Sequence, residues 1–168
     1  MAQTHTHVLQ PCSSDCEPFV ESQQSIRSQI QAISPFLDRL MRFILRFRNA
    51  DGSEVDIEMA LREALVNSVI HGNCEDPHKR VEVTCRCCMD GEVSITVRDQ
   101  GAGFDSLTVP DPTVAEHKLM THGRGIYLMK TLMDEVCFEA GGTVVRMRKE
   151  SNSGATAPRR KDDKHPRT

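Results

Sequence analysis

Residues 63–72 read Glu-Ala-Leu-Val-Asn-Ser-Val-Ile-His-Gly, and this stretch decides how the rest of the chain is interpreted. A helical period of about 100° per residue puts Glu63, Asn67 and His71 on one face of a helix expected over residues 54–71. The flanking residues of that face are apolar: Met59, Ala60, Ala64, Val66 and Ile70. An acid and an amide one turn apart are therefore expected to point away from bulk water. Burying them without partners is costly, so something must satisfy them.

Two kinds of partner fit this polar face. One is a buried hydrogen-bond network to neighbouring backbone, which is the commoner arrangement on an arbitrary helix. The other is a bound ligand, because the amide oxygen of Asn67 is a hard, neutral donor of the kind that Mg²⁺ prefers. The carboxylate of Glu63, half-buried one turn away, suits a general base.

A pair of glycines follows an expected strand. Residues 99–104 read Asp-Gln-Gly-Ala-Gly-Phe and come just after Val97, where that strand ends. Glycines allow backbone conformations and close approaches that a Cβ forbids. An aspartate at a strand end can accept a hydrogen bond from an exocyclic amine such as that of adenine. Taken alone, the pattern also fits an ordinary turn.

A second pair of glycines, in Gly123-Arg124-Gly125, opens a helix expected over about residues 125–133. Backbone N–H groups and the positive end of the helix dipole form an anion site at such a position, with Arg124 as a further contact. The alternative is an ordinary glycine-rich start of a helix. The Gly-x4-Gly-Lys-[Ser/Thr] pattern of P-loop proteins is absent from the sequence.

The remaining periodicities predict an α+β protein with helices on one face of a largely antiparallel sheet. One helix is expected after Ser34, with Ser34 as its N-cap and Pro35 as its first residue. Ser53 is expected to cap the helix that carries Glu63. Alternating residues predict four strands and a weaker fifth one: 81–87, 93–97, 136–140, 143–147 and, weakly, 25–30.

Length and composition limit the class of protein. The chain has 168 residues, 38% hydrophobic and 27% charged, which allows one domain with tails. We expect a flexible segment over 1–21, a folded domain over 22–149 and a disordered basic tail over 150–168. A formal net charge of -3 argues against a strongly basic nucleic-acid-binding protein. No apolar run approaches the roughly 18 to 20 residues that span a bilayer, and no secretory signal is visible, so a cytoplasmic location is expected.

The seven cysteines do not indicate a disulfide framework. Their number is odd, and Cys85, Cys87 and Cys88 crowd one expected strand, where they fit small packing residues. An alternative is a zinc site near the start of the chain, although its spacing matches no familiar ligand pattern. That site would use four residues: His5, His7, Cys12 and Cys16.

The three motifs together resemble the N, G1 and G2 boxes of the GHKL (histidine-kinase-like) ATPase superfamily. The matching patterns, in order, are Glu63-x3-Asn67-x3-His71, Asp99-x-Gly101-x-Gly103-Phe104 and Gly123-x-Gly125-Ile126-Tyr127-Leu128-Met129. Over about residues 22–148 the sequence most resembles those of the bacterial anti-sigma-factor serine/threonine-protein kinases. The resemblance implies the Bergerat ATP-binding fold, a two-layer α/β sandwich with a mixed, mostly antiparallel sheet and helices on one face.

The resemblance also implies a role for each motif residue. Asn67 would hold Mg²⁺ on the phosphates of ATP, and Glu63 would be the catalytic residue that orients or deprotonates the acceptor hydroxyl. Asp99 would read the adenine amino group, and Thr143 would complete that pocket. Residues 105–122 would form a lid that closes on ATP. The remaining cofactor-binding residues would be Gly101, Gly103, Phe104, Gly123, Arg124 and Gly125.

By the same resemblance, the protein would be an ATP-dependent serine/threonine kinase and an anti-sigma factor. It would bind a sigma factor and phosphorylate an anti-anti-sigma (STAS-type) antagonist, as a homodimer, with no direct contact to nucleic acid or membrane. Some members carry an arginine just before the second pair of glycines, where Thr121-His122 stand here. The alternative is therefore an ATP/ADP-binding regulatory switch module without phosphotransfer.

Overall fold

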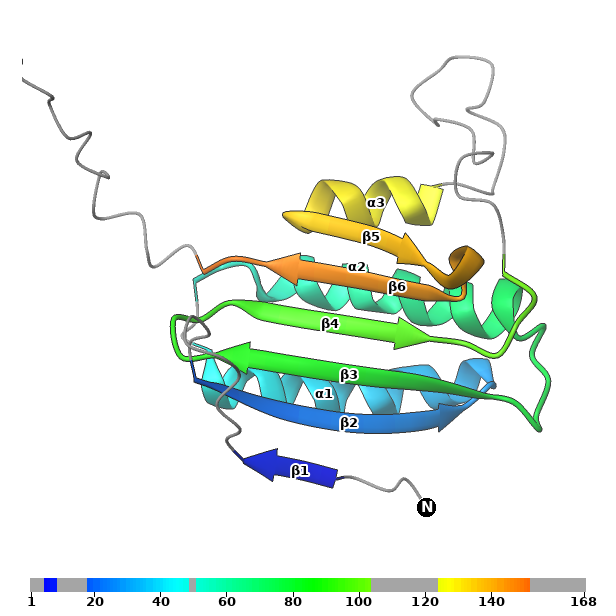
Figure 1. The fold of residues 1–168 in the computed structure, drawn as a ribbon, viewed down its shortest axis with the longest axis horizontal. Helices are drawn as coiled ribbons and strands as arrows, with labels where there is room; N and C mark the ends of the chain where they lie inside the picture. The colour runs from blue at the N-terminus through cyan, green and yellow to red at the C-terminus, as the bar shows by residue number, and fades with distance from the viewer. Residues whose placement is uncertain (1–4, 9–17, 49–50, 104–123, 152–168) are drawn as a thin grey trace, which may run out of the picture.

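One antiparallel sheet carries three helices on a single face (Figure 1). The computed structural model describes residues 18–48, 51–103 and 124–151, and the backbone of residues 5–8. Its strands are β1 (His5–Val8), β2 (Phe19–Arg27), β3 (Arg80–Cys88), β4 (Val93–Arg98), β5 (Glu135–Glu139) and β6 (Val144–Lys149). Its helices are α1 (Ile33–Phe47), α2 (Glu54–Val66) and α3 (Arg124–Leu132), with short turns η1 (Ile30–Ala32), η2 (Asn67–Gly72) and η5 (Ala140–Gly142).

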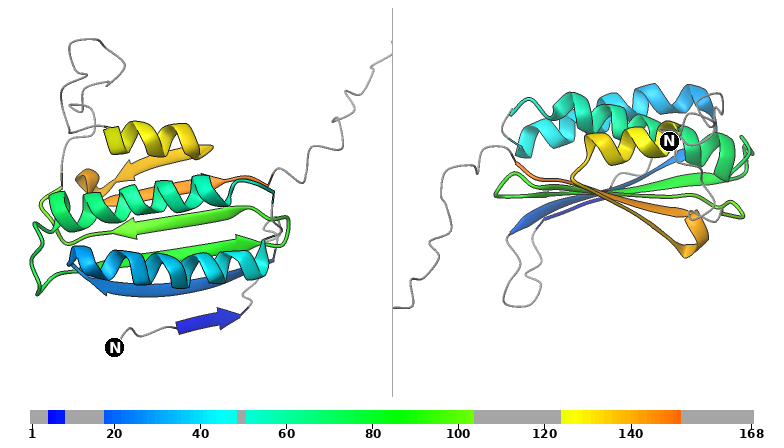
Figure 2. Two further views of the ribbon diagram at one scale, coloured as in Figure 1. Left: turned by 180° about the vertical axis from the view of Figure 1, so that it is seen from behind. Right: turned by 90° about the horizontal axis from the view of Figure 1, so that it is seen from above.

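The sheet order is β1-β2-β3-β4-β6-β5, and each pairing between these strands is antiparallel. Seen along the sheet, α1, α2 and α3 all lie on the same side (Figure 2). The predicted α+β sandwich is therefore confirmed. Because β6 returns between β4 and β5, the helix that precedes β5 packs alongside α2, and this places two of the sequence motifs next to each other.

The core lies between the sheet and the helices. Strands β3 and β4 alternate strictly, so that every second side chain is buried under α1 and α2. Cys85 and Cys87 are among these buried residues, with 0% and 1% of their surface exposed. They are free thiols packed as small apolar groups, as the sequence predicted.

The first strands differ from the prediction. The weak strand expected over 25–30 is instead β2, Phe19–Arg27, which pairs with β3 along its whole length. Residues 5–8, expected to lie apart from the fold, form β1 on the edge of β2. The pattern of β2 was hard to recognise because its middle is Glu, Ser, Gln, Gln and Ser, and Ser22 is buried where an apolar residue is usual.

One predicted helix cap is wrong, and the other is right in position but lacks the side-chain bond. Helix α1 begins at Ile33, directly after η1, so Ser34 and Pro35 lie inside its first turn, where a missing N–H is tolerated. Ser53 does precede α2 as predicted, but its side chain makes no cap bond. Its hydroxyl instead donates to Asp51 Oδ1 at 2.6 Å, and its oxygen accepts a hydrogen bond from a buried arginine.

That arginine, Arg48, directly follows α1. It ties the end of α1 and the start of α2 to the chain just after β6. Its side chain is fully buried, and its Nη2 donates to Asp51 Oδ2 (2.7 Å), Ser53 Oγ (2.6 Å) and the carbonyl oxygen of Glu150 (2.8 Å). Asp51 is itself 95% buried at its side chain, with 5% exposed. A buried charge of this kind stays in place only while its partners remain.

We expect Arg48→Ala to lower the free energy of unfolding by about 3–5 kcal/mol, because it leaves the Asp51 carboxylate buried without its cation. Arg42→Ala, at an exposed position of α1, should change the free energy of unfolding by less than about 0.5 kcal/mol. Urea unfolding followed by circular dichroism measures both variants. Equal losses in the two would show that the Arg48 contacts contribute nothing specific.

Candidate functional site

The acid lies on helix α2 and the amide on η2, the π-helical turn that directly continues it. Glu63 lies in the last turns of α2, and Asn67 is the first residue of η2, a single stretch of π-helix. The wider turn is closed by the bond from Asn73 N to Ser68 O, 2.8 Å long and five residues apart. Such π-turns are rare and often occur at functional sites. His71, also within η2, is exposed.

The start of α3 lies directly on Glu63 and Asn67. A Cβ added at Gly125 would stand 2.7 Å from Glu63 Oε2 and 3.3 Å from Asn67 Nδ2, so any larger residue would have to displace the Glu63 side chain. Both polar side chains are half-buried, and no other described side chain hydrogen-bonds to either. The amide oxygen of Asn67 and the carboxylate of Glu63 are ligands of the kind that suit a hard cation.

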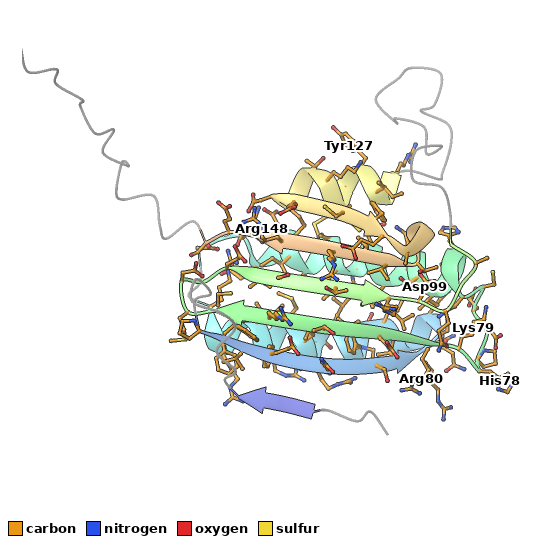
Figure 3. The ribbon with its side chains drawn as sticks, viewed as in Figure 1. His78, Lys79, Arg80, Asp99, Tyr127 and Arg148 are labelled. Carbon is orange, nitrogen blue, oxygen red and sulfur yellow. The ribbon has the colours of Figure 1, made fainter. Side chains whose placement is uncertain are left out.

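Asp99 stands just beyond β4, at the opposite end of η2 from Asn67 (Figure 3). Its backbone N–H donates to Thr143 O at 3.0 Å, and its Oδ1 accepts from Gly101 N at 2.8 Å. The hydroxyl of Ser68 also hydrogen-bonds to this carboxyl group. The carboxylate is thus held by the adjacent loop and by Ser68, and the Asp99 backbone is held by Thr143.

Two glycines make this placement possible. A Cβ at Gly72 would lie 2.5 Å from the Asp99 carboxyl carbon, and a Cβ at Gly101 would lie 2.1 Å from the Gly72 carbonyl oxygen. A side chain at Gly101 would push the loop after β4 away from the backbone of η2, and one at Gly72 would displace the Asp99 carboxylate. The sequence indicated Gly72 only as the end of a helix, and its role in the site was missed.

The third glycine approach joins the loop to the turn before β6. Gly103 has φ +77°, and a Cβ there would lie 2.0 Å from Gly141 O and 3.2 Å from Thr143 Cγ2. Asp99, Gly101, Gly103 and Thr143 therefore lie together, as the sequence analysis expected. Phe104, Gly123 and the predicted lid over 105–122 fall outside the described residues.

Burial raises the pKa of the Asp99 carboxyl group above its ordinary value. Three groups oppose this effect by favouring the ionised form: the N–H of Gly101, the hydroxyl of Ser68 and the positive charge of Lys79. Asp99 is only partly buried, and an ionised carboxylate in such a position can accept a hydrogen bond from a ligand amine. Ser68 was missed in the sequence because nothing in the local pattern relates it to Asp99.

The two ends of the site suit different chemistry. At one end, Glu63, Asn67 and the N-terminal residues of α3, Arg124 and Gly125, offer a carboxylate, an amide oxygen and backbone N–H groups. That end fits a cation and an oxygen-rich anion. At the other end, the Asp99 carboxylate fits an amine donor. An elongated ligand that carries phosphates and an amino-substituted base would match both.

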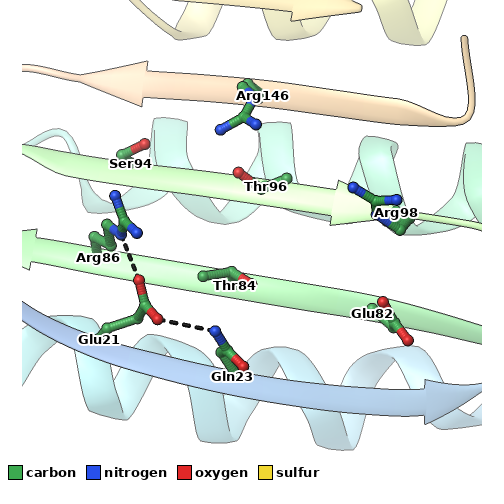
Figure 4. Close-up of a pocket in the computed structure, with 9 residues that line it drawn as sticks. All are labelled: Glu21, Gln23, Glu82, Thr84, Arg86, Ser94, Thr96, Arg98 and Arg146. Atoms are coloured by element: carbon green, nitrogen blue, oxygen red, sulfur yellow. Dashed lines mark hydrogen bonds and ion pairs between the residues drawn. The ribbon is translucent and has the colours of Figure 1, made fainter. Parts of the chain in front are cut away.

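A second polar feature lies on the sheet face opposite the helices (Figure 4). It is a groove of about 240 Å³ lined by outward-facing residues of β2, β3, β4 and β6. Its charges largely pair within the sheet: Arg86 with Glu21, which also accepts from Gln23 at 2.9 Å. This groove belongs to the solvated face and contains none of the motif residues.

Two further findings concern metal and membrane. Among the described residues, no group of three or more His, Cys, Asp and Glu side chains is placed to hold a metal ion. The alternative zinc site lies outside the residues whose side chains are described. No helix in the described part of the chain is both long enough and apolar enough to cross a membrane.

Known proteins match this chain over the same region. The family described as histidine kinase-like ATPase domain matches residues 26–149. An anti-sigma F factor of Heyndrickxia coagulans is 35% identical over 97 residues, which are 55% of this chain and 66% of that protein. The anti-sigma F factor of Clostridium botulinum (strain Eklund 17B / Type B) is 38% identical over 104 residues, 58% of this chain and 71% of that protein.

We expect Asp99→Asn to raise the melting temperature at pH 7. The folded-state pKa of Asp99 lies above that of the unfolded chain, so ionisation costs stability above the folded pKa, and this cost disappears as the pH falls below about 4. Asparagine keeps the acceptor for Gly101 N and removes the charge. Thermal unfolding between pH 3.5 and 7, by calorimetry, measures the difference.

Asp38→Asn, at an exposed position of α1, is the matched control and should show no such gain at pH 7. A lower melting temperature of Asp99→Asn at pH 7 would mean that the buried charge is stabilising, contrary to the expectation.

Proposed function

Because the chain belongs to the histidine kinase-like ATPase domain family, we propose that it binds ATP with Mg²⁺ and transfers a phosphoryl group to a serine or threonine of a partner protein. The observation that supports this most directly is the close approach of Gly125 to the side chains of Glu63 and Asn67. It leaves a carboxylate and an amide oxygen facing the start of a helix, where phosphates are well stabilised. The matched region supports a domain over residues 22–149.

Each residue has one task in this proposal. ATP supplies the phosphoryl group, and Mg²⁺ neutralises the charge of its phosphates. Asn67 offers its amide oxygen to the cation, and the N–H groups at the start of α3, with Arg124, face the phosphates. Asp99 accepts from the adenine amino group, with Thr143 beside it. Glu63 would accept the proton of the acceptor hydroxyl as its oxygen attacks the γ-phosphorus, and ADP would leave as the bond from that phosphorus to the bridging oxygen breaks.

Positioning and charge neutralisation suffice for this reaction. Phosphoryl transfer demands little covalent chemistry from the protein, so one base, one metal ligand and an anion site are an adequate set. In this structure the three parts come from α2, η2 and α3, which are held together by close packing around Gly125.

We further propose that the protein is a cytoplasmic anti-sigma factor. Its relatives at 35–38% identity are named anti-sigma F factors. The partners in this proposal are a sigma factor, held by direct binding, and an anti-anti-sigma antagonist of the STAS type, which supplies the acceptor hydroxyl. A homodimer is the proposed state.

A second candidate function is a nucleotide-dependent switch that binds ATP or ADP without transfer. The sequence Thr121-His122 favours it, since some members of the family carry an arginine there to assist the terminal phosphate. Incubation with γ-labelled ATP and the antagonist protein separates the two. Label on the antagonist supports the kinase, and ATP binding without label supports the switch.

We expect Asn67→Ala to abolish the gain in ATP affinity that Mg²⁺ confers. The alanine removes the amide oxygen that holds the cation, while the Asp99 end of the site remains intact. Isothermal titration with ATP, in Mg²⁺ and separately in EDTA, provides the comparison for each protein. If parent and variant gain equally from Mg²⁺, Asn67 does not hold the metal.

We expect Glu63→Gln to bind ATP as the parent does and to lose phosphoryl transfer by about 10²–10⁴-fold, the usual contribution of a general base. Single-turnover transfer of label to the antagonist measures the rate. Glu58→Gln, one turn earlier on the solvent side and paired with Arg62, is the matched control and should transfer normally. Normal transfer by Glu63→Gln would remove the base from the mechanism.

A further inference from the structure

Asn73 is completely buried, although it is an amide directly after η2 and belongs to none of the three motifs. Its Nδ2 donates to the carbonyl oxygen of Arg80 at 3.1 Å, and its Oδ1 accepts from the backbone N–H of Gln100 at 2.8 Å. Its own N–H closes the π-turn on Ser68 O at 2.8 Å. One side chain therefore ties η2 to the first residue of β3 and to the loop after β4.

A further bond closes this arrangement into a ring. The side-chain Oε1 of Gln100 accepts from the backbone N–H of Arg80 at 2.8 Å, so Asn73, Arg80 and Gln100 restrain one another. Gln100 lies between Asp99 and Gly101, the residues at the amine-binding end of the site. The peptide that carries the Asp99 carboxylate is thus held on one side by Thr143 and on the other by Asn73.

The spacing leaves almost no freedom at this point. The Gly72 Cβ position lies 2.5 Å from the Asp99 carboxyl carbon, and the Gly101 Cβ position lies 2.1 Å from Gly72 O. Hydrogen bonds lose strength steeply when their angle is poor, so an acceptor must be held within a fraction of an ångström to discriminate between donors. The two side-chain bonds of Asn73 hold η2 against this loop across that close approach.

We propose that Asn73 is a positioning residue that sets selectivity for adenine by holding the Asp99–Gln100 peptide against the end of η2. Adenine presents an amino group where guanine presents a carbonyl oxygen. A carboxylate held in place accepts from the amino group and repels the oxygen, whereas a displaced carboxylate does neither well. This inference rests on the proposed nucleotide binding of the same site.

The test compares the affinities of the full chain for Mg²⁺-ATP and Mg²⁺-GTP, measured by titration calorimetry. Asn73→Ala should lower the ratio of ATP to GTP affinity about fivefold to tenfold, the usual weight of one hydrogen bond. Asn73→Asp keeps the acceptor for Gln100 N but loses the donor to Arg80 O and buries a charge, so it should also lower the ratio. Gln100→Gly, which removes the acceptor for Arg80 N at an exposed position, should lower the ratio about threefold by loosening the same peptide.

A merely structural role would change both affinities together. Arg48→Lys loosens the fold elsewhere, because Arg48 bonds Asp51, Ser53 and Glu150, whereas Asn73 bonds Arg80 and Gln100. It controls for lost stability and should leave the ratio unchanged. A parent that binds ATP selectively, with an unchanged ratio in Asn73→Ala or Gln100→Gly, overturns the inference and leaves the proposed function standing. A parent that binds neither nucleotide overturns the proposed function itself. If Asn73→Ala does not fold, Gln100→Gly decides.

Discussion

Close approach of neighbouring segments at four glycines is the constraint on which the candidate site depends. Gly72, Gly101, Gly103 and Gly125 each stand where a Cβ would come within 3 Å of a neighbouring segment. The neighbours are the Asp99 carboxylate, two carbonyl oxygens and the Glu63 carboxylate. These four approaches bring α2, η2, the loop after β4 and α3 into one site, because steric exclusion fixes a distance more sharply than any single hydrogen bond.

The site also carries a cost that the rest of the fold offsets. The core between α1, α2 and the sheet is apolar and closely packed. Among the described residues, Arg48 Nε is the only buried side-chain nitrogen or oxygen without a hydrogen-bond partner. By contrast, Glu63 and Asn67 are half-buried without a hydrogen bond to another described side chain, and burial raises the pKa of Asp99. Polar groups kept ready for a ligand commonly reduce stability in this way.

The turn η2 connects the two ends of the site through six residues. Asn67 begins it at the end facing α3, and Gly72 ends it against Asp99, with Asn73 next in sequence. A shift of this turn would therefore move the amide oxygen and the carboxylate together. Within this turn Ser68 bonds Asp99, while the preceding residue, Asn67, faces Gly125.

The sequence by itself determined the periodic elements and the motif residues. Alternation in residues 81–87 and 93–97 and the apolar face of residues 54–71 state which side is buried, since burial follows local period. The tertiary structure alone decided the rest: β2 with its polar middle, the buried Arg48 and Asn73, and the reason for Gly72. These depend on contacts between residues far apart in the chain, and no local pattern records which distant backbone atom a side chain will meet.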